Sequence, residues 1–174
     1  MQTVTDTSAN SKLEVFFITM LQEIYWSEQN LINVLSTMTI SATHPELIQA
    51  FDLHKRQTEE HVRIVERVFN MLDRVPEALP SAGLQGLFDE GWQVIDETEA
   101  GTSQRDVALI IAAQKVEHYE IACYGSLVTI AATLGLTKVV DELRVILTEE
   151  KETDATLTII AESKINVQAS EEKV

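Results

Sequence analysis

The amino-acid sequence predicts an all-α protein: a bundle of four long helices, with a short fifth helix in the long connection between the second and third. Three observations favour this fold. Only six Gly and three Pro occur among 174 residues, which leaves too few turn signals for many short strands. Apolar residues recur three and four positions apart, the period of a helix packed on one face. The length and the 45% hydrophobic content fit one domain with a substantial core.

The first long helix is expected over residues 11–41. Residues 1–10 are polar and are predicted to form a disordered leader. Ser11 is followed three positions later by Glu14, the spacing of a capping box that begins a helix. The apolar stripe of this helix contains Phe17, Leu21, Ile24, Leu31, Ile32 and Leu35.

The second long helix is expected to run to about residue 72. Thr43 and Glu46 form another capping box around Pro45, a residue tolerated in a first helical turn. The inner face of this helix contains Leu47, Phe51, Val65, Val68 and Leu72. Residues 74–82 include two prolines, which end the helical pattern.

The short helix is expected over residues 84–99, and the third long helix follows it. Ser103 and Asp106 can cap this third helix, which is expected to end near Leu134. Gly135 is well placed as its C-terminal cap. The short helix has an apolar face of Leu84, Leu87, Phe88, Trp92 and Ile95.

The last long helix is expected over residues 137–163, and residues 164–174 are interpreted as a polar tail. The connections after the first and third long helices are short, so each of these helices should pack antiparallel to its successor. The connection between the second and third is long enough to return along the bundle. Two hairpins joined by one long crossover form a ferritin-like arrangement, predicted here for residues 11–163.

Each long helix interrupts its apolar stripe with charged or imidazole side chains near its middle. Glu117 and Glu120 are the clearest pair, because both fall on the apolar stripe of the third long helix. Carboxylates in an apolar core are costly unless cations or hydrogen bonds compensate them. Because the helices are similar in length, the interruptions should share one level of the bundle. The residues of this polar layer are Glu28, His54, His61, Glu117, Glu120, Glu150 and Asp154.

Two bound metal ions would relieve the repulsion within this layer. The nearby cations Arg63, Lys115 and Lys151 fall on other helix faces. Carboxylate oxygen and imidazole nitrogen suit iron, manganese or zinc better than copper(I). We therefore expect the seven residues of the layer to hold two metal ions, with iron as the leading candidate.

Several of these residues have a second interpretation. Glu28 faces solvent if the first helix is rotated. His54 and His61 are separated by about 10.5 Å along a helix, at 1.5 Å per residue, so both cannot comfortably bind one ion. For each histidine, the alternative role is that of a hydrogen-bonded histidine in the core or at its rim. One of the two can support a metal ligand without binding the metal itself. Asp154 has a short side chain and can instead anchor a neighbour.

Three aromatic or imidazole residues lie near the layer in sequence. Tyr25 and Tyr124 are expected to be packing residues whose hydroxyls reach the layer. His118 stands between two glutamates, but on a helix it points about 100° away from the carboxylate stripe. It is therefore left out of the predicted metal site.

Charge and composition exclude several classes of function. A net charge of −15 disfavours direct binding of nucleic acid, because phosphate contacts need clustered Lys and Arg. The sequence has no run of about 18 apolar residues, so no membrane span is expected. Cys123 is the only cysteine, which excludes an intramolecular disulfide and suits a reducing cytoplasm. We therefore expect a cytoplasmic protein.

The sequence resembles the YciF/YciE-like branch of the ferritin superfamily, bacterial proteins linked to stress responses. The segments that carry the resemblance are residues 21–28, 54–61, 112–120 and 149–154. The resemblance covers nearly all of residues 13–162, and the third segment is the most specific. It implies a ferritin-like bundle, a homodimer and a dinuclear metal site.

One departure affects what the resemblance implies about activity. Ferritins and rubrerythrins have Glu-x-x-His on the second and fourth helices, and this sequence contains no such motif. Thr58 stands three residues before His61, and Thr153 stands three residues after Glu150. Asp154 is then a possible substitute for the missing histidine of the fourth helix. The departure leaves metal binding in place and weakens the transfer of ferroxidase or peroxidase activity.

Two functions of different classes follow from the sequence. The first is a dinuclear metal protein, with iron favoured, that reacts with a small oxidant such as oxygen or peroxide. The second is a non-enzymatic scaffold or stress protein with a metal-free polar core, whose polar layer fixes the register of the helices.

Overall fold

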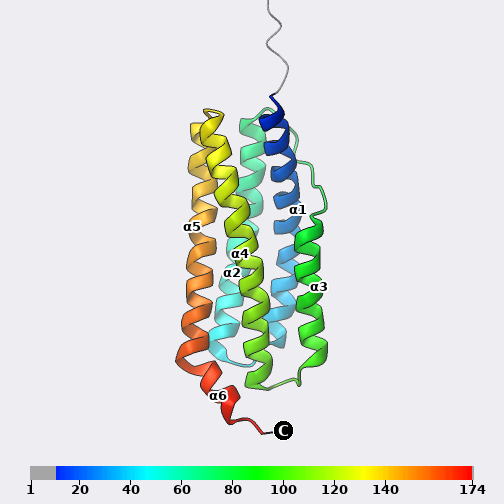
Figure 1. Ribbon diagram of the computed structural model, residues 1–174, viewed down its shortest axis with the longest axis vertical. Coiled ribbons are helices and arrows are strands. Elements are labelled where there is room, and N and C mark those ends of the chain that lie inside the picture. The colour runs from blue at the N-terminus through cyan, green and yellow to red at the C-terminus, as the bar shows by residue number, and fades with distance from the viewer. Residues whose placement is uncertain (1–10, 174) are drawn as a thin grey trace, which may run out of the picture.

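The computed structural model describes residues 11–173 and confirms the all-α fold (Figure 1). The predicted leader, residues 1–10, lies outside the described residues. The long helices are α1 (Lys12–Ser41), α2 (Pro45–Met71), α4 (Ser103–Thr133) and α5 (Thr137–Ile160). The shorter segments are α3 (Ala82–Glu97), a π-helical turn η1 (Ala161–Ile165) and α6 (Asn166–Glu171). No helix within residues 11–173 has the length and apolar character needed to cross a membrane.

The long helices form two hairpins, α1 with α2 and α4 with α5, joined by a crossover that contains α3 (Figure 1). Contacts of α1 with α4 and of α2 with α5 close the bundle. α3 packs mainly on α4 and more lightly on α1. The topology is the one predicted from the connection lengths. Gly135 ends α4 with a φ of 75°, the left-handed conformation that glycine adopts readily at this position.

The starts of α1 and α2 show which predicted caps are right. Ser11 accepts a hydrogen bond of 3.1 Å from the amide of Glu14, as predicted. The prediction for α2 is wrong, because His44 rather than Thr43 precedes the helix and accepts the hydrogen bond from the Glu46 amide. Ala42 and His44 are extended, and the amides of Thr43 and His44 are held by a different partner.

That partner is Asp106, which the sequence placed in the cap of its own helix. Thr102 rather than Ser103 caps α4. Asp106 is 2% exposed, and its two oxygens accept hydrogen bonds of 2.8 Å from the amides of Thr43 and His44. It therefore ties the α1–α2 connection to the first turn of α4.

Replacing Asp106 by Ala is expected to lower the free energy of unfolding by roughly 1–3 kcal/mol, because the half-buried His44 amide loses its partner, whereas water can replace the carboxylate at the exposed Thr43. Urea denaturation measures the change. Asp96→Ala, at an exposed carboxylate on α3, is the control and should shift stability by less than about 0.5 kcal/mol. Equal stability of the two variants would contradict the role given to Asp106.

The C-terminal boundary differs from the prediction. Residues 164–171, expected within a polar tail, are helical, because η1 and α6 continue directly from α5. Ile165 is fully buried against the core, and the wider π turn brings it there. The carboxylate of Glu172 accepts hydrogen bonds from the amides of Ser103 and Gln104. Ile165 stands among polar residues, so helical periodicity alone did not reveal this extension.

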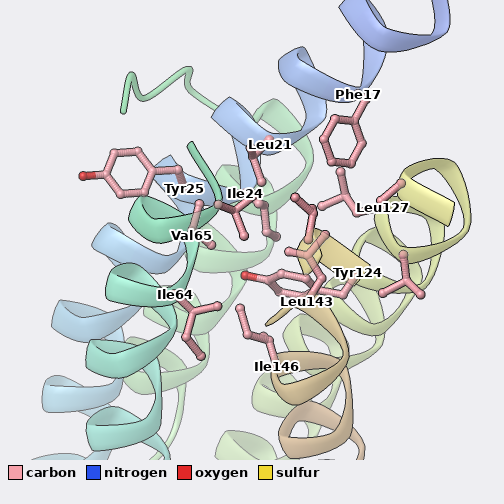
Figure 2. Packing of buried hydrophobic residues seen from close by; sticks show 14 of the residues in the cluster. Phe17, Leu21, Ile24, Tyr25, Ile64, Val65, Tyr124, Leu127, Leu143 and Ile146 are labelled. Carbon is pink, nitrogen blue, oxygen red and sulfur yellow. The ribbon is translucent and has the colours of Figure 1, made fainter. Parts of the chain in front are cut away.

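The buried apolar residues form two clusters, one toward each end of the bundle. The first joins the N-terminal half of α1 to the C-terminal halves of α2 and α4 and the N-terminal half of α5 (Figure 2). The second joins the opposite halves of these helices and includes residues of α3. Ile24 and Leu31 belong to different clusters, and Glu28 lies between them on α1. The predicted polar layer is therefore the level at which the two clusters meet.

Candidate metal centre

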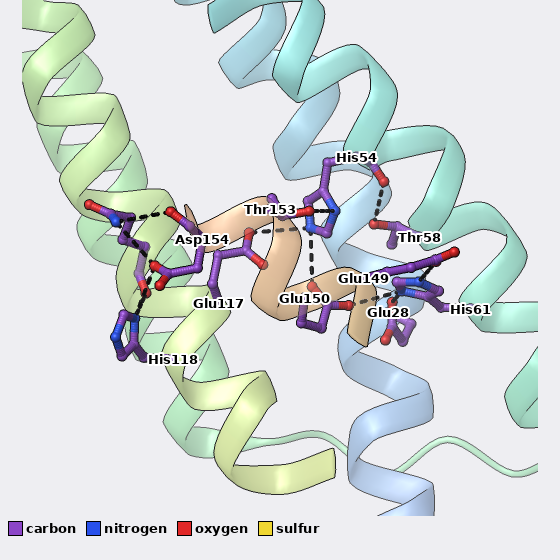
Figure 3. Close-up of polar contacts among 11 residues, drawn as sticks. Glu28, His54, Thr58, His61, Glu117, His118, Glu149, Glu150, Thr153 and Asp154 are labelled. Atoms are coloured by element: carbon purple, nitrogen blue, oxygen red, sulfur yellow. Dashed lines mark hydrogen bonds and ion pairs between the residues drawn. The ribbon is translucent and has the colours of Figure 1, made fainter. Parts of the chain in front are cut away.

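The four long helices bring six of the seven predicted residues together inside the bundle, and Figure 3 labels all of these six except Glu120. Helix α1 contributes one, α2 two, α4 two and α5 one. All six are at most 1% exposed, which settles the orientation of α1 and places Glu28 inside. The six residues are Glu28, His54, His61, Glu117, Glu120 and Glu150.

The first group of potential ligands consists of His54, Glu117, Glu120 and Glu150. One ligand atom from each lies within 4.8 Å of the others. The Nε2 atom of His54 is 3.2 Å from Oε1 of Glu117 and 3.6 Å from Oε2 of Glu150. Three helices therefore supply one imidazole and three carboxylates to a single point.

The second group consists of Glu28, His61 and again Glu150, within the same 4.8 Å limit. The Nδ1 atom of His61 is 3.0 Å from Oε1 of Glu150 and 3.5 Å from Oε2 of Glu28. Glu150 thus approaches His54 with one carboxylate oxygen and His61 with the other. The imidazole rings of His54 and His61 are 6.4 Å apart between centroids, so each histidine has its own group.

Buried polar atoms without a hydrogen-bond partner gather at this centre. Buried polar groups in proteins are otherwise almost always paired, because an unpaired one keeps its full cost of leaving water. Within residues 11–173 the buried side-chain nitrogen and oxygen atoms that form no hydrogen bond all belong to the six residues, although several lie within ion-pair distance of one another: Glu28 Oε2, His54 Nε2, His61 Nδ1, Glu117 Oε2, both oxygens of Glu120 and both oxygens of Glu150. These are the atom types that bind iron, manganese or zinc.

The charge of the centre also fits two divalent ions. Four carboxylates carry four negative charges when ionised, and two neutral imidazoles add none. Two divalent cations would neutralise the set. Within the described chain, no Lys or Arg forms an ion pair with these carboxylates, since their ion-pair partners are the two histidines.

Without cations, Glu117, Glu120, Glu150 and His61 all have raised pKa values and so retain protons more readily than they would in water. Burial raises the pKa of Glu117 and of Glu150 to about 8. Burial also raises the pKa of Glu120 well above its ordinary value, and repulsion from the neighbouring glutamates adds to the increase. For His61, burial lowers the pKa, but attraction to Glu28 and Glu150 outweighs it and raises the pKa to about 11.

Three further residues hold the ligands from outside. The Tyr124 hydroxyl donates a hydrogen bond to Glu28, so Tyr124 reaches the layer as predicted. Glu149 lies 2.7 Å from Nε2 of His61, and the Thr153 hydroxyl lies 3.3 Å from Nδ1 of His54. The role of Glu149 was not predicted, and Thr153 was noted only as a departure from the family motif.

Asp154 is the one predicted residue that the structure leaves outside both groups. Its carboxylate lies 3.3 Å from Nδ1 of His118 and accepts a hydrogen bond of 3.0 Å from Gln114, so it anchors neighbours on α4 (Figure 3). Four residues beyond Glu150, it is rotated about 40° around the helix, and its short side chain does not reach back. His118 is largely exposed and points away, as predicted.

Tyr25 packs in the core against Phe69, as predicted, but its hydroxyl does not reach the polar layer. Its hydroxyl donates a hydrogen bond of 2.8 Å to Glu66, away from the polar layer. Figure 2 shows the phenol ring directed outward beside α2. Burial and the contact with Glu66 raise the pKa of Tyr25 to about 12.

The fold and the buried layer define a helical-bundle protein with a candidate two-metal centre. The chain belongs to the family described as a domain of unknown function, DUF892, whose model matches residues 12–170. It is 37% identical over 158 residues to Protein YciF of Escherichia coli strain K12, covering 90% of this chain and 95% of YciF. The predicted resemblance is confirmed.

Two solved structures have the same fold. The crystal structure of the E. coli stress protein YciF matches with a TM-score of 0.85 and 36% identity, covering 90% of this chain and 99% of that one. The structure of YcfI from Rhodopseudomonas palustris matches with a TM-score of 0.83 and 30% identity, covering 88% of this chain and 98% of that one.

Proposed function

We propose that this protein binds two divalent metal ions, most readily iron, between its four long helices. The observation that carries the proposal is that buried oxygen and nitrogen atoms without hydrogen bonds converge in two groups that share Glu150. His54, Glu117 and Glu120 would hold one ion. Glu28 and His61 would hold the other, and Glu150, which belongs to both groups, would help to hold each ion.

The chemistry of such a centre depends on its metal. Paired iron ions, when bound, supply oxidation–reduction chemistry toward oxygen or peroxide. The chain itself provides anionic ligands in a layer closed above and below by apolar clusters, which limits the access of water. Because E. coli YciF is described as a stress protein, we propose a role for this centre in a bacterial stress response.

Metal content tests the proposal directly. Protein purified without a chelating tag and loaded anaerobically with ferrous iron is expected to hold about two ions per chain by elemental analysis. Glu150→Gln is expected to lose most of both ions, because Glu150 belongs to both groups. Asp154→Asn is the matched control, since it removes a carboxylate from the same helix one turn away, outside both groups, and should retain two ions.

A metal-free scaffold is the second candidate function. YcfI, described as a proposed structural protein, favours it. In that case the polar layer is filled by shared protons and fixes the register of the helices. Wild-type protein that takes up no metal after anaerobic loading would exclude the first function and favour the scaffold.

A further inference from the structure

Each buried histidine of the centre is held by a residue of α5 through the ring nitrogen that faces away from the ligand group. Nε2 of His61 lies 2.7 Å from Oε2 of Glu149, and Nδ1 of His54 lies 3.3 Å from Oγ1 of Thr153 (Figure 3). Glu149 and Thr153 are one helical turn apart, on either side of Glu150 in sequence. A single helix therefore supplies the shared ligand and both histidine supports.

The two supports are chemically different. An ionised carboxylate can only accept a hydrogen bond, so Nε2 of His61 carries a hydrogen toward Glu149. Nδ1, which faces Glu28 and Glu150, is then the nitrogen that would give up its proton and offer its lone pair to a metal ion. The Thr153 hydroxyl can donate or accept, so it orients His54 without deciding which ring nitrogen carries the hydrogen.

The two groups also differ in their number of potential protein ligands. The group that contains His54 has four protein ligands, whereas the group that contains His61 has three. The second position therefore depends more heavily on its single imidazole. Glu149 has a side chain that is 31% exposed, so it supports that imidazole from the edge of the bundle and is not itself one of the buried ligands.

We propose that Glu149 is a positioning residue that prepares His61 to bind the second metal ion. This inference rests on the proposed function and adds to it an inequivalence of the two metal positions. Partners of this kind typically change metal affinity 10–100-fold when removed, because they fix the tautomer and the ring orientation. Loss of Glu149 should therefore lower the affinity for one of the two ions by roughly 10–100-fold and leave the affinity for the other unchanged.

Titration of metal-free protein with Co²⁺, followed by visible absorption, tests the inference. Wild-type protein is expected to bind two equivalents. Glu149→Ala should lower the affinity for the second equivalent of Co²⁺ by roughly 10–100-fold. Glu149→Gln should keep part of that affinity, because its amide oxygen still accepts the hydrogen bond from His61. Glu152→Ala, at an exposed carboxylate on the same helix, is the control and should match wild type.

The possible outcomes distinguish failure of the proposed function from failure of the role given to Glu149. Absence of any Co²⁺ binding by wild-type protein overturns the proposed function, and with it this inference. Two equivalents in wild type and in Glu149→Ala, with equal affinities, overturn the inference alone. A Glu149→Ala variant that weakens both equivalents together and lowers the unfolding temperature of the metal-free protein shows a general structural role, which also overturns it.

Discussion

Replacing Glu117 and Glu120 together by Gln is expected to reduce bound metal from about two ions per chain to at most one. Both carboxylates belong only to the group that contains His54, so that group keeps one imidazole and the shared Glu150. Gln has nearly the same shape but is a weaker ligand without charge. Elemental analysis after anaerobic loading measures the loss.

The same double variant should be at least as stable as wild type when both are free of metal. Gln removes the cost of burying carboxyl groups that have no cation, and uncharged replacements of buried ionic groups are often neutral or stabilising. Urea denaturation in a chelating buffer compares the two. The control variant changes two exposed carboxylates, Glu152 and Glu162, to Gln. A double variant that keeps two ions, or that loses several kcal/mol without metal, would refute the assignment.

The stability of the metal-free protein is expected to fall as pH rises from about 4.5 to about 8. Glu117 and Glu150 have pKa values raised to about 8 in the fold, so over this range the folded state binds more protons than the unfolded state. The contribution of these two carboxyl groups to stability is fully present below their unfolded pKa of 4.5. It is lost progressively as the pH rises to their folded pKa of about 8. At about 1.4 kcal/mol per pKa unit, one such carboxyl alone accounts for roughly 5 kcal/mol.

His61 acts in the same direction at higher pH. Its pKa is raised from 6.5 to about 11, so its contribution is present below pH 6.5 and is lost as pH rises toward 11. Bound metal should reverse the trend, because the ligands must lose protons to bind and affinity therefore grows with pH. Thermal unfolding at several pH values, with Mn²⁺ and with chelator, shows both slopes. A metal-free protein that gains stability with rising pH would contradict the assigned shifts.

Much of the fold could be predicted because each long helix carries its own signals. Helical periodicity placed the four stripes, and the connection lengths decided which helices pair. Errors arose where a contact comes from elsewhere in the chain. Thr43 has the sequence of a cap, but Asp106, 63 residues later, binds its amide. Ile165 has polar residues on both sides in the sequence, yet the core buries it.

The same distinction explains the candidate site. Glu28, Glu120 and Glu150 were predictable because a residue within an apolar stripe points where the stripe points. Glu149 and Thr153 lie beside the stripe of α5, and their role depends on how α2 and α5 are rotated and offset against each other. That arrangement is a property of the packed bundle, and neither helix encodes it alone.

Under the proposed function, the polar layer between the two apolar clusters would link the lifetime of the chain to its metal supply. A ligand that binds only the folded state stabilises it in proportion to the logarithm of its concentration, and the unfolded fraction determines how often proteases attack. A chain filled with metal under the proposed function would persist, whereas a starved chain would be degraded sooner. The cell would then adjust the amount of this protein through turnover, without a separate sensor.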